Sequence, residues 1–260
     1  MASLFVVVLA LFAAAAASPS RIIGGNPTRI ENYPSVVQVE SLNFGIFWTH
    51  SCAGSILNSI FILSAAHCFS GTAYAPENRR IRAGATNLES GGVIVHIAQE
   101  INHPSYGLNG NDGDISVVRL SSALILTPNN PSIAVGSIVA AGSTMFGNMP
   151  VTKVGWGITE IGGEFAPQLQ EARVVVVDRQ LCAFRYSSLS SAPEVTENMF
   201  CAGTATADAC DGDGGAPVFF TNIVVGVVSW GNGCLQPGFP GVNTAVSNYT
   251  PWIMAVTAAN

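Results

Sequence analysis

The chain has 260 residues, of which 48% are hydrophobic and only 10% are charged, and its formal net charge is −6. This length allows one large domain or two small ones, and the apolar fraction is sufficient for a sizeable core. The chain is acidic and has no cluster of Lys and Arg residues, which argues against nucleic acid as a partner.

The first feature along the chain is a predicted secretory signal. Residues Ala2–Ser18 form a continuous apolar run that ends in small residues. The run is short for a membrane span, although no basic segment precedes it, and an N-terminal membrane anchor is the alternative. We therefore predict a signal peptide over residues 1–17, a secreted, extracellular protein, and no membrane partner.

Short β-rich stretches follow, separated by Gly, Pro and Asn residues. This pattern is typical of an all-β sandwich or barrel. The segment Val174–Val177 is apolar on both faces, so we expect this strand to be covered on both sides. The clearest stretches are Ser35–Glu40, Ile115–Leu120, Ala172–Asp178 and Ile223–Trp230.

Only the C-terminal segment has a pattern that clearly predicts a helix. Thr250 is suited to cap a helix, and Pro251 is suited to the first helical position. Trp252, Ile253 and Val256 then share one apolar face. We expect a short helix that starts at Pro251.

The six cysteines form an even set behind the predicted signal peptide, which favours disulfides formed in an oxidising compartment. Six cysteines allow fifteen pairings, and their number alone does not choose among them. Metal binding is the competing interpretation, but no CxxC or HxxxH spacing supports it, and no acidic loop suggests calcium. We expect no metal and no other cofactor.

Three motifs in a fixed order carry a resemblance to a known family. They are RIIGG at 21–25, SAAHC at 64–68 and DACDGDGGAP at 208–217. These motifs resemble the activation site, the histidine motif and the nucleophile motif of the chymotrypsin/trypsin-like serine proteases, and the chain looks closest to insect gut trypsins. The resemblance implies two antiparallel six-stranded β-barrels with the site in the cleft between them. The domains implied are a signal peptide (1–17), an activation peptide (18–21) and a protease domain (22–260), with a crossing between barrels near 127–132.

The resemblance assigns a general base and the acid that orients it. His67 matches the histidine that accepts the proton of the nucleophile. Asp114 matches the orienting acid; Asp112 is the alternative, but the apolar strand follows Asp114 directly. Ser229 matches the residue that supports this acid in the family. Histidines without such a context are expected to be surface or structural: His50, His96 and His103.

The resemblance also implies an activation step and an oxyanion hole. Cleavage after Arg21 by a trypsin-like protease would free the amine of Ile22, which in the family pairs with a buried carboxylate. Asp213 matches that carboxylate, and such a buried pair is tolerable only when both partners are present. The backbone N–H groups of Gly212 and Gly214 match the donors that stabilise the developing oxyanion.

The pocket that the resemblance implies is of the trypsin type. Asp208 matches the acid at the pocket floor, which attracts Lys or Arg and binds Arg through two parallel hydrogen bonds; a loop carboxylate beside a cysteine is the alternative. Ala209 stands where many trypsins have Ser, which should favour Arg over Lys. Gly231 and Gly241 match the glycines of the pocket wall, and the resemblance places Ser229 among the substrate-binding residues as well.

The resemblance also selects one of the fifteen possible pairings of the cysteines. The disulfides that it implies are Cys52–Cys68, Cys182–Cys201 and Cys210–Cys234.

Nine of the ten basic residues are arginine, with Lys153 as the exception. Arginine keeps its charge at pH values that neutralise lysine, which suits an alkaline gut lumen. Ordinary compositional drift explains the same bias equally well.

The chain departs from the family pattern where the nucleophile is expected. Gly214 takes the place of the catalytic Ser, and Ala216 and Asn243 replace a Gly and a Tyr. A glycine cannot form an acyl-enzyme, and no serine lies between Cys201 and Thr221 to replace it.

We therefore predict a pseudoenzyme that binds Arg-containing peptides or protease inhibitors as a decoy or regulator. One alternative is a digestive trypsin-like endopeptidase whose parent carries Ser at 214. Another is an interaction protein that uses its outer surface.

Overall fold

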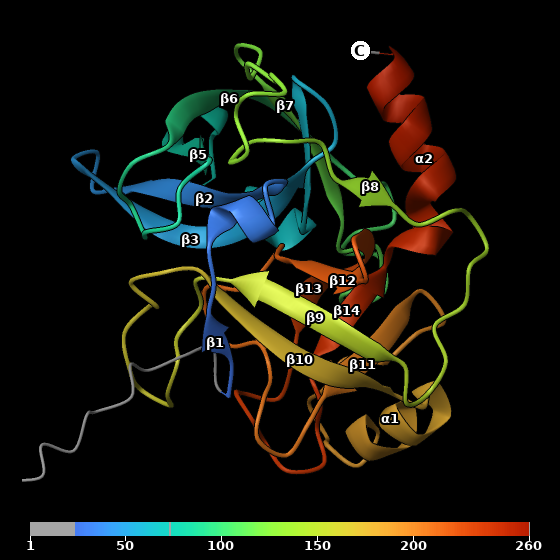
Figure 1. Cartoon of the computed structure of the whole chain (residues 1–260). Coiled ribbons are helices and arrows are strands. Elements are labelled where there is room, and N and C mark those ends of the chain that lie inside the picture. The colour runs from blue at the N-terminus through green and yellow to red at the C-terminus, as the bar shows by residue number, and fades with distance from the viewer. Residues whose placement is uncertain (1–23, 73, 260) are drawn as a thin grey trace, which may run out of the picture.

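Two antiparallel β-barrels make up most of the molecule, one above the other in Figure 1. The computed structural model describes residues 24–72 and 74–259. The predicted signal peptide, the activation peptide and the two residues at the predicted cleavage bond, Arg21 and Ile22, lie outside this part of the chain. No helix within the described ranges is long and apolar enough to cross a membrane.

The first barrel closes on itself in the strand order β2-β3-β4-β7-β6-β5. Apolar side chains that point inward, among them Val39, Ile81 and Val117, form one buried cluster. The short 3-10 helices η1 (Ile30–Asn32), η2 (Ala66–Phe69) and η3 (Pro76–Asn78) accompany this half of the chain. Its strands are β2 (Val36–Asn43), β3 (Phe47–Ile56), β4 (Phe61–Ser64), β5 (Arg79–Ala83), β6 (Val93–Asn102) and β7 (Ser116–Leu120).

The second barrel closes in the order β9-β10-β11-β14-β13-β12, because β9 pairs with both β10 and β12. Short β1 (Asn26–Pro27) adds to β10, and β8 (Ser137–Ile138) lies parallel to β13. Residues 121–149 link the barrels, and the segment 127–132 lies within this link. The barrel strands are β9 (Pro150–Gly155), β10 (Gln170–Val177), β11 (Met199–Gly203), β12 (Pro217–Phe220), β13 (Ile223–Trp230) and β14 (Val242–Ala245).

All four predicted β stretches fall on strands, namely β2, β7, β10 and β13. The expectation that Val174–Val177 is covered on both sides was wrong. Val174 and Val176 are buried, whereas Val175 is 38% exposed. In a barrel successive residues alternate between the interior and the outside, so the outward valine of β10 meets solvent despite its apolar character.

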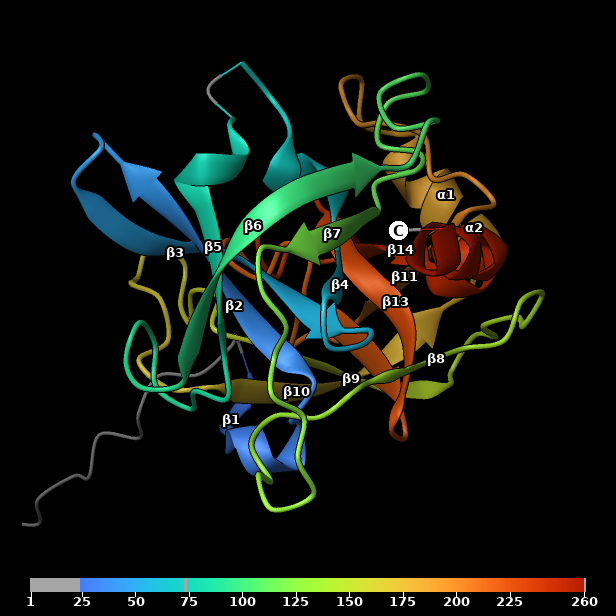
Figure 2. The ribbon, with the colours of Figure 1, turned by 90° about the horizontal axis from the view of Figure 1, so that it is seen from above.

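The C-terminal helix α2 is present, but its predicted start was wrong. It spans Val246–Ala259, so Thr250 is not its cap and Pro251 lies inside it. Proline has no N–H to bond the carbonyl four residues earlier. That carbonyl, of Ser247, instead accepts a hydrogen bond from the N–H of Gly142 at 3.4 Å. The helix lies against β13, as the view along its axis shows (Figure 2).

A second helix, α1 (Arg179–Tyr186), was not predicted from the sequence. Asp178 caps it, since its side chain accepts a hydrogen bond from the N–H of Leu181 at 2.9 Å. The helix is only eight residues long and buries Cys182 and Tyr186. A segment this short gives too few turns for a clear apolar periodicity.

Candidate functional site

A histidine, an aspartate and a serine meet in the cleft between the barrels. His67 lies on η2, just after β4, and its Nδ1 is 2.8 Å from Oδ2 of Asp114. The N–H of His67 donates to Oδ1 of the same carboxylate at 2.9 Å. Ser229, on β13 of the second barrel, donates its hydroxyl to Oδ2 at 2.5 Å. A carboxylate accepts only, so Nδ1 carries the proton and Nε2 is free to accept one from a reacting group.

Asp112, the alternative orienting acid, belongs to a different network. Its Oδ1 accepts hydrogen bonds from the hydroxyl of Thr196 at 2.5 Å and from Nδ2 of Asn198 at 3.1 Å. These contacts tie the loop before β7 to the chain just before β11. The geometry therefore favours Asp114 as the partner of His67.

Gly214 lies opposite the free nitrogen of His67. Its carbonyl accepts a hydrogen bond from the N–H of Ala53 at 2.8 Å, which fixes this loop of the second barrel against the first. A Cβ built on Gly214 would collide with Nε2 of His67. Position 214 is therefore the place from which a side chain would meet Nε2 of His67, the predicted general base, and the chain has no side chain there.

Two backbone amides of the loop around Gly214 have no hydrogen-bond partner within the described part of the chain. Among the described residues, neither the N–H of Gly212 nor that of Gly214 donates a hydrogen bond. Gly212 adopts a φ of +89°, which a residue with a side chain rarely takes. Both predicted oxyanion-hole donors are therefore present and unengaged beside His67.

His50 has a structural role, as the sequence analysis allowed, although its specific contact with this loop was not foreseen. Its Nε2 lies 2.9 Å from the carbonyl oxygen of Gly212, so Nε2 carries the proton and donates it. The side chain is buried, its ring meets that of Phe165 edge-on, and burial lowers the pKa of His50 to about 4.

Asp213 stands between Gly212 and Gly214 in the same loop, and its side chain is buried beneath the loop. Oδ1 accepts the N–H of Gly157 at 2.8 Å, and Oδ2 accepts the N–H of Cys210 at 3.1 Å. Burial raises the pKa of Asp213 from 3.8 to about 6. A cation beside this carboxylate would oppose that rise. The predicted pairing with the amine of Ile22 stays a prediction, since Ile22 lies outside the described residues.

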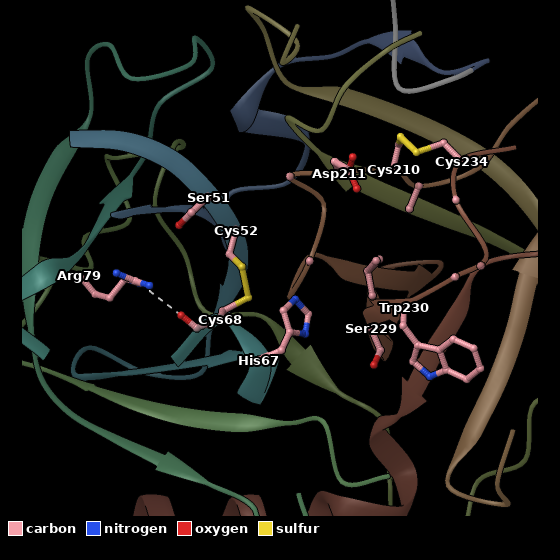
Figure 3. Close-up of a pocket in the computed structure, with 17 residues that line it drawn as sticks. Ser51, Cys52, His67, Cys68, Arg79, Cys210, Asp211, Ser229, Trp230 and Cys234 are labelled. Atoms are coloured by element: carbon pink, nitrogen blue, oxygen red, sulfur yellow. Dashed lines mark hydrogen bonds between the residues drawn. A yellow bond between two sulfur atoms is a disulfide. The ribbon is translucent and has the colours of Figure 1, made fainter. Parts of the chain in front are cut away.

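A cavity of about 380 Å³ opens beside His67 (Figure 3). Four residues predicted for the pocket line it: Ala209, Ser229, Gly231 and Gly241. Asp208 does not line it. That aspartate is 4% exposed and borders a neighbouring hollow of about 280 Å³.

The carboxylate of Asp208 already has a cationic partner inside the protein. Nζ of Lys153 lies 2.7 Å from Oδ1 of Asp208. The expectation that Asp208 is an open anionic floor for arginine is therefore revised. The sequence signal was present but overlooked, since Lys153 is the single lysine of the chain and stands in the apolar strand sequence VTKVGWG.

Three disulfides join the cysteine pairs that the resemblance implies: Cys52–Cys68, Cys182–Cys201 and Cys210–Cys234. Two of these bridges stand on opposite walls of the cavity in Figure 3. In residues 24–72 and 74–259, two groupings of potential metal ligands also occur, around His67 and around Asp211. In both, the cysteine sulfurs are already oxidised to disulfides, so neither offers a thiolate to a metal.

Comparison with known proteins places this cleft in a family. The family model described as Trypsin matches residues 22–253. The chain belongs to the trypsin family. It is 40% identical over 252 residues to trypsin CFT-1 of Choristoneura fumiferana, covering 95% of each chain. It is 38% identical to alkaline trypsin C of Manduca sexta (96% of this chain, 98% of the relative) and 34% identical to trypsin alpha of Drosophila erecta (90% and 87%).

Two further departures from the trypsin pattern lie behind the cleft. Ala216 is buried in the core of the second barrel. Asn243, on β14, is also buried, and its Nδ2 donates to the carbonyl oxygens of Phe200 at 3.1 Å and Gly241 at 3.2 Å. These bonds attach Asn243 to the backbone of the pocket wall, where a tyrosine would bring a bulky ring.

Proposed function

We propose that this trypsin-family protein binds substrate-like peptide segments in its cleft without cleaving them. The observation that carries the proposal is Gly214, the residue that faces Nε2 of His67. Covalent catalysis needs a nucleophile at this place, and glycine has none. In subtilisin, loss of the catalytic serine alone costs roughly a million-fold in turnover. A loss of that size leaves no useful peptidase.

Several retained features favour binding over decay of the cleft. His67 keeps its partner Asp114, and Asp114 keeps its partner Ser229. The amides of Gly212 and Gly214 remain free to receive a carbonyl oxygen. A cleft of this kind suits the exposed loop of a protease inhibitor, which binds in the manner of a substrate. The proposed role is therefore that of a secreted decoy or regulator of active proteases.

The proposal includes activation by cleavage after Arg21, by a trypsin-like protease. The buried carboxylate of Asp213 supports this step, because its raised pKa marks a site where a cation would be favourable. The amine of Ile22, once freed, is the cation that the family pattern supplies. Pairing would keep Gly212 and the pocket ordered.

A second candidate function is digestive proteolysis by a parent protein with Ser at 214. The names of the relatives favour it, since they are trypsins, among them alkaline trypsins of Manduca sexta. In that case Gly214 is a variant of an active enzyme. Reading the codon from independent clones separates the two candidates.

The test is hydrolysis of fluorogenic peptide amides by protein that has been cut after Arg21 and freed of the cutting protease. A panel with Arg, Leu or Phe before the scissile bond covers charged and neutral pockets. We expect no turnover by the natural protein and measurable turnover by Gly214→Ser. His67 must shift slightly to admit the new side chain, so partial activity is expected. Turnover by the natural protein at a rate near that of Gly214→Ser would contradict the proposal.

A further inference from the structure

Lys153 is fixed in the middle of the second barrel. It lies on β9, paired with Ala172 of β10 on one side and with Val218 of β12 on the other. Its side chain is 1% exposed. The backbone is held on both edges and the side chain is almost fully buried, so this ammonium group stays inside the protein.

The ammonium and the carboxylate of Asp208 satisfy one another. Nζ donates to Oδ1 of Asp208 at 2.7 Å and to the carbonyl oxygen of Ala202 at 2.8 Å. The carboxylate also accepts the N–H of Ala209 on Oδ1 at 2.7 Å and the N–H of Gly241 on Oδ2 at 2.8 Å. Buried charges are tolerated when paired and hydrogen-bonded in this way. The pair carries no net charge.

A thin glycine wall separates this pair from the cavity. A Cβ built on Gly241 would lie 2.8 Å from Oδ1 of Asp208 and 3.0 Å from Nζ of Lys153. Gly241 also lines the cavity, whereas Asp208 and Lys153 do not. A cation entering the pocket would therefore sense the ammonium and the carboxylate at similar range, and their fields oppose one another.

The remaining charged groups at the cavity are Asp211, Arg79 and the titratable His67. Asp211 is exposed, and it stands across the cavity from Arg79 in Figure 3. Their opposite charges compensate, and water weakens the field of an exposed group. The rest of the lining is uncharged and includes the small residues Ala209 and Gly231 and the large ring of Trp230.

We propose that Lys153 is a specificity-determining residue: by neutralising Asp208 from within the barrel, it makes the pocket a site for uncharged side chains. Peptide segments with an aromatic or aliphatic residue at the pocket then bind better than those with arginine or lysine. This inference rests on the proposed function only in taking the cleft as the site that receives a peptide. It does not depend on whether the bound segment is cut.

The test compares two small probes of the same shape, benzamidine, which is cationic, and benzamide, which is neutral. Their dissociation constants are measured by NMR titration on the full protein cut after Arg21. We expect the natural protein to bind benzamide at least as tightly as benzamidine. In Lys153→Met the freed carboxylate, which only Gly241 separates from the cavity, should reverse this order and favour benzamidine by about tenfold or more, because its field is then uncompensated.

Two further variants control for the removal of charge. Lys153→Met combined with Asp208→Asn leaves no charge behind Gly241, so the preference for benzamidine should disappear again. Arg173→Met removes one exposed cation from β10 and should leave the probe preference of the natural protein unchanged. Unfolding curves report whether each variant is folded.

The result on the natural protein decides the proposal even if Lys153→Met fails to fold. Tenfold tighter binding of benzamidine than of benzamide by the natural protein would overturn it, and so would binding of neither probe. Neither probe contains a peptide bond, and their dissociation constants measure binding alone, so the outcome is independent of Gly214. Hydrolysis by the natural protein would sink the proposed function and leave this inference standing.

Discussion

Two buried ionisable residues, His50 and Asp213, belong to or contact the loop that carries Gly212, and burial shifts their pKa values in opposite directions. Burial lowers the pKa of His50 to about 4 and raises that of Asp213 to about 6. A lowered histidine pKa weakens the fold as the pH falls from 6.5 towards 4, whereas a raised aspartate pKa weakens it as the pH rises through 6. The two trends oppose one another in the natural protein, so paired variants are needed to separate them.

The variant Asp213→Asn should separate the contribution of Asp213 to the pH dependence of stability from that of His50. In protein not cut after Arg21, the contribution of Asp213 to stability is complete below pH 3.8 and is lost as the pH rises through about 6. Asp213→Asn is neutral throughout. The free energy of unfolding of the natural protein, relative to that of Asp213→Asn, should therefore fall by about 2 kcal/mol between pH 4 and pH 7.

Urea unfolding at pH 4, 5.5 and 7 measures this difference, and His50 is common to both proteins. Cleavage after Arg21 should abolish the fall or reverse its sign, because a paired amine lowers the pKa of Asp213. A difference between the two proteins that stays constant with pH would contradict this account of the buried carboxylate.

At the scale of elements, two disulfides close similar lengths of chain, but only one of them lines the cavity beside His67. Cys210–Cys234 closes a separation of 24 residues and lines the cavity, and the N–H of Cys210 donates to Asp213. Cys182–Cys201 closes 19 residues and packs between α1 and β11 instead. Both bridges stabilise the fold, but only the first holds the wall of the pocket.

Replacing each bridge by a pair of alanines should separate these roles. We expect either replacement to lower the free energy of unfolding by about 2–4 kcal/mol. Only Cys210→Ala with Cys234→Ala should also weaken the binding of benzamide, because it releases the loop that lines the pocket. Chemical denaturation and NMR titration measure the two effects. Equal loss of binding in both double variants would show that the contrast is mistaken.

Comparison of the predicted and observed elements shows which bounds the local sequence predicts and which depend on distant residues. Strand β13 was predicted with its observed bounds, because its apolar run ends at clear turn residues. The start of α2 was missed because the carbonyl left without a partner by Pro251 is satisfied by Gly142, more than a hundred residues away. The exposure of Val175 likewise depends on the barrel closing, which no single strand encodes.

At the scale of the whole molecule, the site belongs to neither barrel alone. The first barrel supplies His67 and Asp114, and the second supplies the loop of Gly212 and Gly214 together with Ser229. Motif order predicted which residues meet here, because each motif is short and contiguous. The fold brings them together, and it also brings Lys153 to Asp208 from a distant strand.

That last contact marks the limit of motif matching. Asp208 and its neighbours match the trypsin pattern, and on this ground alone the pocket was expected to hold arginine. The partner that cancels its charge stands 55 residues earlier, on β9. An isolated lysine in a strand of valines was the available clue, since a buried lysine requires a paired acid.

The central claim is that the cleft binds a peptide segment and leaves it intact. The most direct measurement is incubation of the protein cut after Arg21 with a protease inhibitor whose exposed loop presents leucine to the pocket. Calorimetry gives the affinity and mass spectrometry gives the state of the loop, with Gly214→Ser as the matched comparison. We predict a one-to-one complex in which the natural protein leaves the loop uncut. A loop cut by the natural protein, or the absence of any complex, would contradict the claim.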